Sequence, residues 1–99
     1  MNRRGHRGKV DANQAALVRE LRQLGYSVVS LASVGDGCPD ILVGDRRAKL
    51  NFLFELKDGT KPPSARKLTE AEAAFHAAWH GQVAVVETTE QALRVMGRT

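Results

Sequence analysis

The chain has 99 residues, with 15 Lys and Arg against 11 Asp and Glu, a formal net charge of +4 and a sequence pI near 9.7. This length fits one domain with a single modest core, and the content of 42% hydrophobic and 26% charged residues excludes a disordered or fibrous chain. No apolar stretch approaches the roughly 20 residues that span a bilayer, and the N-terminus has no apolar signal core. We therefore expect a cytoplasmic protein without membrane contact, and its single cysteine, Cys38, suits a reducing compartment.

The first nine residues form a basic segment that we expect to be a flexible arm, followed by one domain over residues 10–99. The segment has two glycines and no large apolar residue after Met1, so it has no face to bury. It is either a solvated terminus without a role or a site of non-specific contact with nucleic-acid phosphates. The cations that would make this contact are Arg3, Arg4, Arg7 and Lys9.

The rest of the chain predicts a mixed α/β domain. Apolar residues at helical spacing predict a helix over 11–24, with Gly25 as its C-terminal cap. Apolar runs predict strands over 26–31 and 40–43, and strict alternation predicts a third strand over 50–57, after a basic turn at 44–49. A basic loop at 58–67 precedes a helix over 69–80, which Thr69 and Glu72 start as a capping box. A buried strand over 82–86 and a closing helix over 88–96 complete the order α-β-β-β-α-β-α around one sheet.

The third strand and the second helix have predicted buried faces. In the strand, Phe52 and Phe54 share the core face, whereas Glu55 and Lys57 share the other, charged face. In the helix, the apolar residues at helical spacing are predicted to be buried rather than to stack on nucleic-acid bases. These residues are Ala73, Phe75, Ala78 and Trp79.

Asp40, Glu55 and Lys57 are the candidate site. Glu55 and Lys57 leave the same face of one predicted strand and Asp40 begins its neighbour, so all three converge if the two strands pair as a hairpin. Two close carboxylates repel each other unless a cation lies between them, and hard oxygen ligands favour Mg²⁺ or Mn²⁺ over zinc. A bound cation would support phosphodiester hydrolysis. Lys57 would then orient the attacking water, neutralise the phosphate or act as a base. An ordinary surface Glu–Lys pair beside a Pro-Asp turn fits the spacing equally well.

Two segments extend this pattern to a known family. Residues 37–40 (Gly-Cys-Pro-Asp) and 54–57 (Phe-Glu-Leu-Lys) resemble the motif of the PD-(D/E)XK nucleases, and more narrowly the stand-alone virus-type replication-repair nuclease (VRR-NUC) domains of phages and bacteria. The similarity extends over about residues 11–93 and includes the Lys-Leu-Thr segment at 67–69. It implies a restriction-endonuclease-like three-layer α/β fold, one or two Mg²⁺ or Mn²⁺ ions, cleavage of DNA, and a bacterial cell or phage-infected host. Stand-alone relatives also tend to be homodimers.

The resemblance also implies roles for individual residues. Asp40 and Glu55 fall on the positions of the metal ligands, Leu56 on that of a backbone carbonyl ligand and Lys57 on that of the catalytic lysine. Asp11 and Gln14 fall on the first-helix positions where relatives often have an acidic residue and a glutamine. Relatives often have a glutamine where this chain has Glu72, so Glu72 is expected to act as a helix cap.

Cations in the two basic loops are expected to hold the DNA backbone near the site, unless they only solubilise the loops. They are Arg46, Arg47, Lys49, Lys61, Arg66 and Lys67. His76 and His80 are spaced i, i+4 on a helix, but no further His or Cys is placed to complete a zinc site, so we expect a packing role or solvent exposure. Cys38 is expected to be a small buried residue.

We therefore expect a Mg²⁺- or Mn²⁺-dependent DNA endonuclease, with branched DNA such as a Holliday junction as a candidate substrate. The alternative is an inactive DNA-binding or accessory protein with the same fold, and a small-molecule phosphodiesterase is a third possibility.

Overall fold

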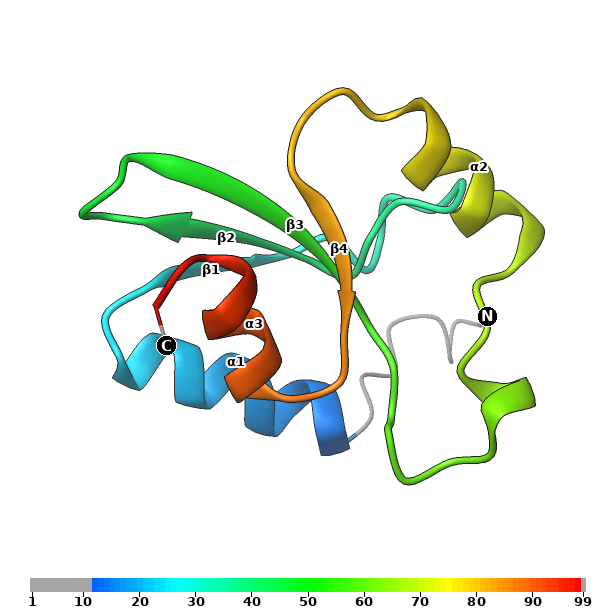
Figure 1. Cartoon of the computed structure of the whole chain (residues 1–99), viewed down its shortest axis with the longest axis horizontal. Helices are drawn as coiled ribbons and strands as arrows, with labels where there is room; N and C mark the ends of the chain where they lie inside the picture. Colours follow the sequence, from blue (N-terminus) through cyan, green and yellow to red (C-terminus); the bar gives the residue numbers. More distant parts are fainter. Residues whose placement is uncertain (1–11, 99) are drawn as a thin grey trace.

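The computed structural model of the chain describes residues 12–98 (Figure 1). The elements in chain order are α1 Ala12–Gln23, β1 Ser27–Ser30, β2 Ile41–Asp45, β3 Leu50–Leu56, the 3-10 helix η1 Pro63–Ala65, α2 Glu70–Ala78, β4 Val83–Val86 and α3 Thr89–Val95. The predicted order of helices and strands is confirmed, with small shifts at the element ends. The predicted basic arm and Asp11 lie outside the described residues.

Within this part of the chain the strands form one four-stranded mixed sheet in the order β1-β2-β3-β4. β2 pairs antiparallel with both β1 and β3, and Ile41 lies opposite Ser30 on one side and Phe54 on the other. β3 pairs parallel with β4, so the connection between them must cross over, and it does so through η1 and α2. The expected β2–β3 hairpin is therefore present.

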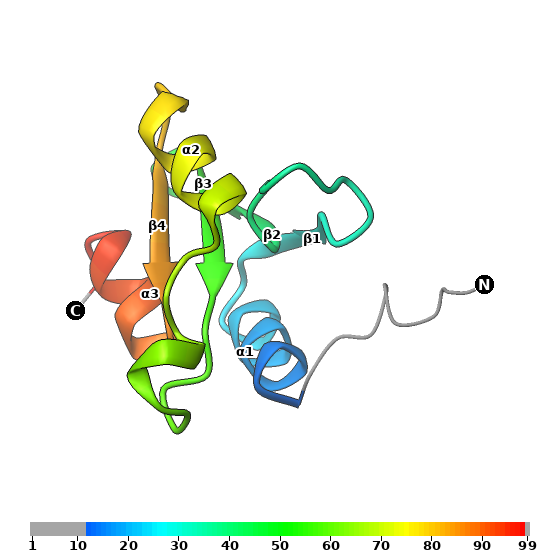
Figure 2. The same ribbon diagram turned by 90° about the vertical axis from the view of Figure 1, so that its right-hand side faces the viewer.

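The helices lie on both sides of the sheet. α1 and α3 lie on one side of β3 and β4, and α2 lies on the other side (Figures 1 and 2). The core lies between the sheet on one side and the two helices α1 and α3 on the other. Its buried residues are Leu17, Leu21, Val28, Ile41, Val43, Phe52, Phe54, Val86, Ala92 and Met96. No helix within residues 12–98 is long and apolar enough to cross a membrane.

The second face of β3 is also covered. Phe52 and Phe54 belong to the core as predicted, yet Leu53 and Glu55 on the opposite face are only 7% and 3% exposed. This burial excludes the interpretation of Glu55 as part of an ordinary surface pair. A buried carboxylate needs a partner or a function, because removing its charge from water is costly.

The predicted burial of the α2 side chains is wrong. All the side chains of α2 are exposed or half-buried, and Trp79, just after the helix, is 47% exposed and stacks on Phe75 with ring centroids 5.2 Å apart. The reason is the way the helix docks, since its first turn lies against the 31–40 loop: a Cβ on Gly37 would be 2.3 Å from the carbonyl oxygen of Ala71. The apolar spacing of α2 therefore serves no core face.

The start of α2 agrees with the sequence, whereas the burial of β4 does not. The capping box is present as predicted: the Thr69 hydroxyl accepts from the Glu72 amide, and the Glu72 carboxylate accepts from the Thr69 amide. The predicted burial of the fourth strand is mostly wrong, because β4 lies at the edge of the sheet. Val86 is fully buried, whereas Val85 is 41% exposed.

Candidate functional site

The β2–β3 hairpin brings Asp40, Glu55 and Lys57 together at one end of the sheet. The Asp40 amide donates to the carbonyl oxygen of Phe54 at 3.0 Å, and Asp40 Oδ2 accepts from the Leu56 amide at 2.7 Å. Asp40 is therefore bound to the residue before Glu55 and to the residue after it, which fixes Asp40 beside Glu55. Lys57 Nζ lies 3.6 Å from Glu55 Oε2. The three residues that the sequence analysis selected therefore share one site.

Glu55 is the buried group of this site. Its side chain is 4% exposed, and within the described part of the chain Glu55 Oε1 has no hydrogen-bond partner. Burial, then the charges of Asp40 and Glu72, raise the pKa of Glu55 to about 8, although Lys57 opposes the rise. The Asp40 and Glu55 carboxyl groups are close enough to share a proton. Two carboxyl groups in this arrangement require either a shared proton or a cation.

Lys57 has a closer partner than Glu55. Its Nζ binds Glu72 Oε1 at 3.0 Å, and the same oxygen accepts from the Thr69 amide at 2.9 Å. Burial disfavours the ammonium, but Glu72, Glu55 and Asp40 outweigh it and raise the pKa of Lys57. Lys57 is therefore held as a cation, and a role as a general base is not favoured in this arrangement.

Glu72 thus belongs to the site as well as to the helix cap. Burial opposes its ionisation, but the Thr69 amide and the Lys57 ammonium hold the pKa of Glu72 below its usual value. The sequence analysis assigned Glu72 only the capping role. The sequence signal for a further role was its position, where members of the resembled family often have a glutamine.

The residues that could hold a cation are few. Among residues 12–98 no group of three His, Cys, Asp or Glu side chains could hold a metal ion. Asp40 and the unpartnered Glu55 Oε1 still offer hard oxygen atoms at one point, which fits Mg²⁺ or Mn²⁺ with water completing the coordination. Glu72 is engaged by Lys57. The roles of the Leu56 carbonyl and of Asp11 stay predictions, and Asp11 lies outside the described residues.

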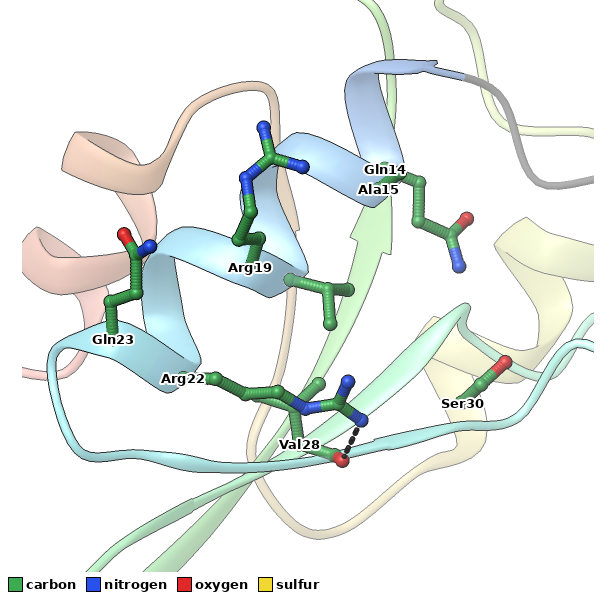
Figure 3. A pocket seen from close by; sticks show the side chains of 8 residues that line it. Gln14, Ala15, Arg19, Arg22, Gln23, Val28 and Ser30 are labelled. Carbon is green, nitrogen blue, oxygen red and sulfur yellow. Dashed lines mark hydrogen bonds between the residues drawn. The ribbon is translucent and has the colours of Figure 1, made fainter.

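The first helix is tied to this end of the sheet. The Asn13 side-chain amide donates to the carbonyl oxygen of Lys57 at 3.2 Å, which fixes the start of α1 beside the end of β3. Gln14, which the resemblance singled out, is the residue after Asn13 and lines the groove between α1 and β1 (Figure 3).

The two predicted groups of loop cations lie in different places. Arg46, Arg47 and Lys49 occupy the β2–β3 turn, and Asp45 opposite Leu50 marks that end of the hairpin. The pair Ile41 and Phe54 marks the site end, about 13 Å away at roughly 3.3 Å per residue. The expectation that the turn flanks the site is therefore wrong, because an antiparallel hairpin places its turn at the end away from the start of its first strand.

The loop after β3 lies at the site end of the sheet, as expected for Lys61, Arg66 and Lys67. Arg66 is engaged there: it donates to the carbonyl oxygen of Lys61 at 2.8 Å and pairs with Glu87 at 3.1 Å. Lys61 and Lys67 are exposed. These two lysines are therefore the loop cations best placed to contact a polyanion.

Cys38 lies near the carboxylates of the site, whereas His76 lies in α2 and His80 just after it. Cys38 is half-buried rather than buried, and burial, then Glu55 and Asp40, raise the pKa of its thiol. The thiol therefore stays protonated beside the carboxylates. No cluster that includes His76 or His80 could hold a metal ion within residues 12–98.

Comparisons of the chain with protein-family models, with curated proteins and with solved structures found no match.

Proposed function

We propose that the protein is a Mg²⁺- or Mn²⁺-dependent DNA endonuclease with a restriction-endonuclease-like fold, related to the PD-(D/E)XK and VRR-NUC nucleases. The observation that carries the proposal is the buried Glu55 carboxyl, whose Oε1 has no partner among the described residues, beside Asp40 and two residues before Lys57. The α-β-β-β-α-β-α order and the mixed sheet support it. DNA, a homodimeric state and a bacterial or phage-infected cytoplasm belong to the same proposal.

The donor set suits a hard divalent cation. Asp40 and Glu55 present carboxylate oxygens, and the Cys38 thiol beside them is kept protonated by burial and by these two carboxylates, which disfavours zinc because a sulfur ligand must be a thiolate. A bound Mg²⁺ or Mn²⁺ would polarise the phosphoryl oxygen and acidify the attacking water. The chain's own contribution is to hold Asp40 rigidly, through the Leu56 amide, and to keep Glu55 out of bulk water.

Lys57 supplies positive charge to the reacting phosphate. Glu72 fixes its ammonium at 3.0 Å and keeps it protonated, so that it can neutralise the phosphate or orient the water by donating a hydrogen bond. Glu72 is accordingly a positioning residue that acts through Lys57.

One observation favours the alternative of an inactive DNA-binding protein. A site with two carboxylates and no third acidic ligand in the described chain is expected to bind a divalent cation weakly. The two functions differ in turnover, so a cleavage assay separates them.

The test is cleavage of linear, flapped and four-way DNA with Mg²⁺ or Mn²⁺. Wild type should cut at least one substrate, and Asp40→Asn, Glu55→Gln and Lys57→Ala should each lower the rate by about 100-fold or more. Glu70→Gln is the matched control, because it removes an exposed glutamate from the same helix as Glu72 and should cut like wild type.

A second experiment measures the binding of Mn²⁺ to each variant by calorimetry. Wild type and Glu70→Gln should bind the ion, and Glu55→Gln should bind it much more weakly. DNA binding without cleavage by wild type in either metal would establish the inactive alternative.

A further inference from the structure

A groove of about 570 Å³ lies between α1 and the β1 edge of the sheet (Figure 3). Its apolar part is formed by Ala15, Val18 and Val28, and two arginines, Arg19 and Arg22, stand one helical turn apart on the same side of α1. None of the described residues that line it carries a carboxylate. The groove therefore combines apolar side chains with positive charge.

Arg22 reaches across the groove to the edge strand. Its guanidinium donates to the carbonyl oxygen of Val28 at 2.9 Å, as Figure 3 shows. This bond occupies an outward-facing backbone acceptor of β1, so the edge is less available for pairing with another strand. Arg22 still has further N–H donors, since a guanidinium carries five. Arg19 is exposed, and no ion pair within residues 12–98 involves it.

These features match a single strand of nucleic acid better than a duplex. A polyanion needs cations, and the groove supplies two without an opposing carboxylate. The bases of a duplex are stacked inside the helix, whereas those of a single strand are free to lie on apolar side chains in a groove. A cationic groove with apolar lining residues therefore suits unpaired nucleotides better than a duplex.

The groove ends close to the proposed catalytic residues. Ser30, which lines one end, pairs in register with Ile41, the residue after Asp40. The amide of Leu31, the residue after Ser30, donates to the carbonyl oxygen of Asp40 at 2.8 Å. A strand that leaves the groove at Ser30 is thus directed toward the end of the sheet where Asp40 lies.

We propose that the α1–β1 groove binds a single-stranded segment of nucleic acid, with its phosphates on Arg19 and Arg22 and its bases on Ala15 and Val18. The identity of this segment as part of the DNA being cut rests on the proposed nuclease function. The binding itself does not.

The experiment is fluorescence anisotropy with a short labelled oligothymidylate in EDTA, so that neither metal nor cleavage is involved. Arg19→Gln should weaken binding several-fold and lower the slope of log K against log salt by about 0.7, the effect of one phosphate contact on a single strand. Arg94→Gln, which removes an exposed arginine from α3, is the matched control and should leave binding unchanged. A duplex of the same length should compete poorly.

A second measurement locates the contact. In an NMR titration with the same oligonucleotide, methyl resonances of Ala15 and Val18 should shift, and those of the exposed Val85 on the opposite edge should not. Equal losses in Arg19→Gln and Arg94→Gln, equal competition by duplex, or shifts at Val85 without shifts at Val18 would each overturn the proposal. Groove binding without cleavage of linear, flapped or four-way DNA in either Mg²⁺ or Mn²⁺ would leave this inference standing and refute the nuclease function.

Discussion

Replacing Glu55 with glutamine in the metal-free protein should stabilise the fold increasingly as the pH rises. Glutamine has nearly the shape of a protonated glutamic acid, so the packing around this 4% exposed side chain is preserved. Burial and the neighbouring charges of Asp40 and Glu72 raise the pKa of Glu55 from 4.5 to about 8. A carboxyl group whose pKa is higher in the folded state favours folding fully below pH 4.5, and this contribution is lost as the pH rises to about 8.

The size of the effect follows from the same two pKa values. At about 1.4 kcal/mol for each pH unit between them, the ionised Glu55 would destabilise the fold by at most roughly 5 kcal/mol above pH 8. Asp40, Lys57 and Glu72 are only partly buried, so water at the edge of the site screens the interaction. We therefore expect a difference of about 1 to 2 kcal/mol between Glu55→Gln and wild type at pH 8.5, and almost none at pH 5.

The assay is urea unfolding in EDTA at several pH values between 5 and 8.5, with Glu70→Gln as the control for loss of an exposed glutamate. The stability difference between Glu55→Gln and wild type should grow over this range, and that of the control should stay flat. Adding Mn²⁺ should then raise the melting temperature of wild type but not of Glu55→Gln. A difference that does not change with pH would refute the buried, ionisable role of Glu55.

Two further predictions concern the frame around the site. Gly37→Ala places a Cβ 2.3 Å from Ala71 O, whereas Gly35→Ala has the same φ near +78° and open space, so Gly37→Ala should lower the free energy of unfolding by about 2 kcal/mol more. Urea unfolding measures both, and equal losses would argue against the close contact. Asp45 pairs with Arg98 at 2.7 Å, and although burial opposes it, hydrogen bonds from the turn amides and Arg98 hold the pKa of Asp45 below its usual value. Asp45→Asn should therefore melt below wild type at pH 7 and approach it as the pH falls through that lowered pKa, and a gap independent of pH would contradict this.

The sequence was informative wherever the physics is local. Alternation places Glu55 and Lys57 on one face of a strand whatever surrounds it, and Thr69 with Glu72 forms a capping box within a single turn. The hairpin follows from two apolar strands joined by a short turn, and it brings Asp40 beside Glu55. These features needed only chain neighbours and one strand pairing.

The sequence-based predictions were wrong where contacts between segments far apart in the chain determine the structure. The apolar spacing of α2 predicts a buried face, but the helix docks with the backbone of Ala71 against Gly37, a contact that no local pattern shows. The contact between Lys57 and Glu72 depends on the same docking, so a residue that looked like a cap also became a member of the site. The β2–β3 turn was misplaced relative to the site because its position follows from strand direction rather than from composition.

The charges of the site link the stability cost of the buried Glu55 carboxylate to a function. Among the described residues, Lys57 supplies the one ammonium that faces Asp40, Glu55 and Glu72, and Glu72 holds it more closely than Glu55 does. Glu55 is consequently left with a buried oxygen that no described residue satisfies. A glutamine at this position would remove the repulsion and keep the shape, so the carboxylate reduces the stability of the metal-free protein. Such a group is expected to be retained when something that is bound during function compensates it, and a divalent cation between Asp40 and Glu55 would compensate both carboxylates at once. The stability of Glu55→Gln and its loss of Mn²⁺ binding are therefore two measurements of one property, and they must change together if the site holds a cation.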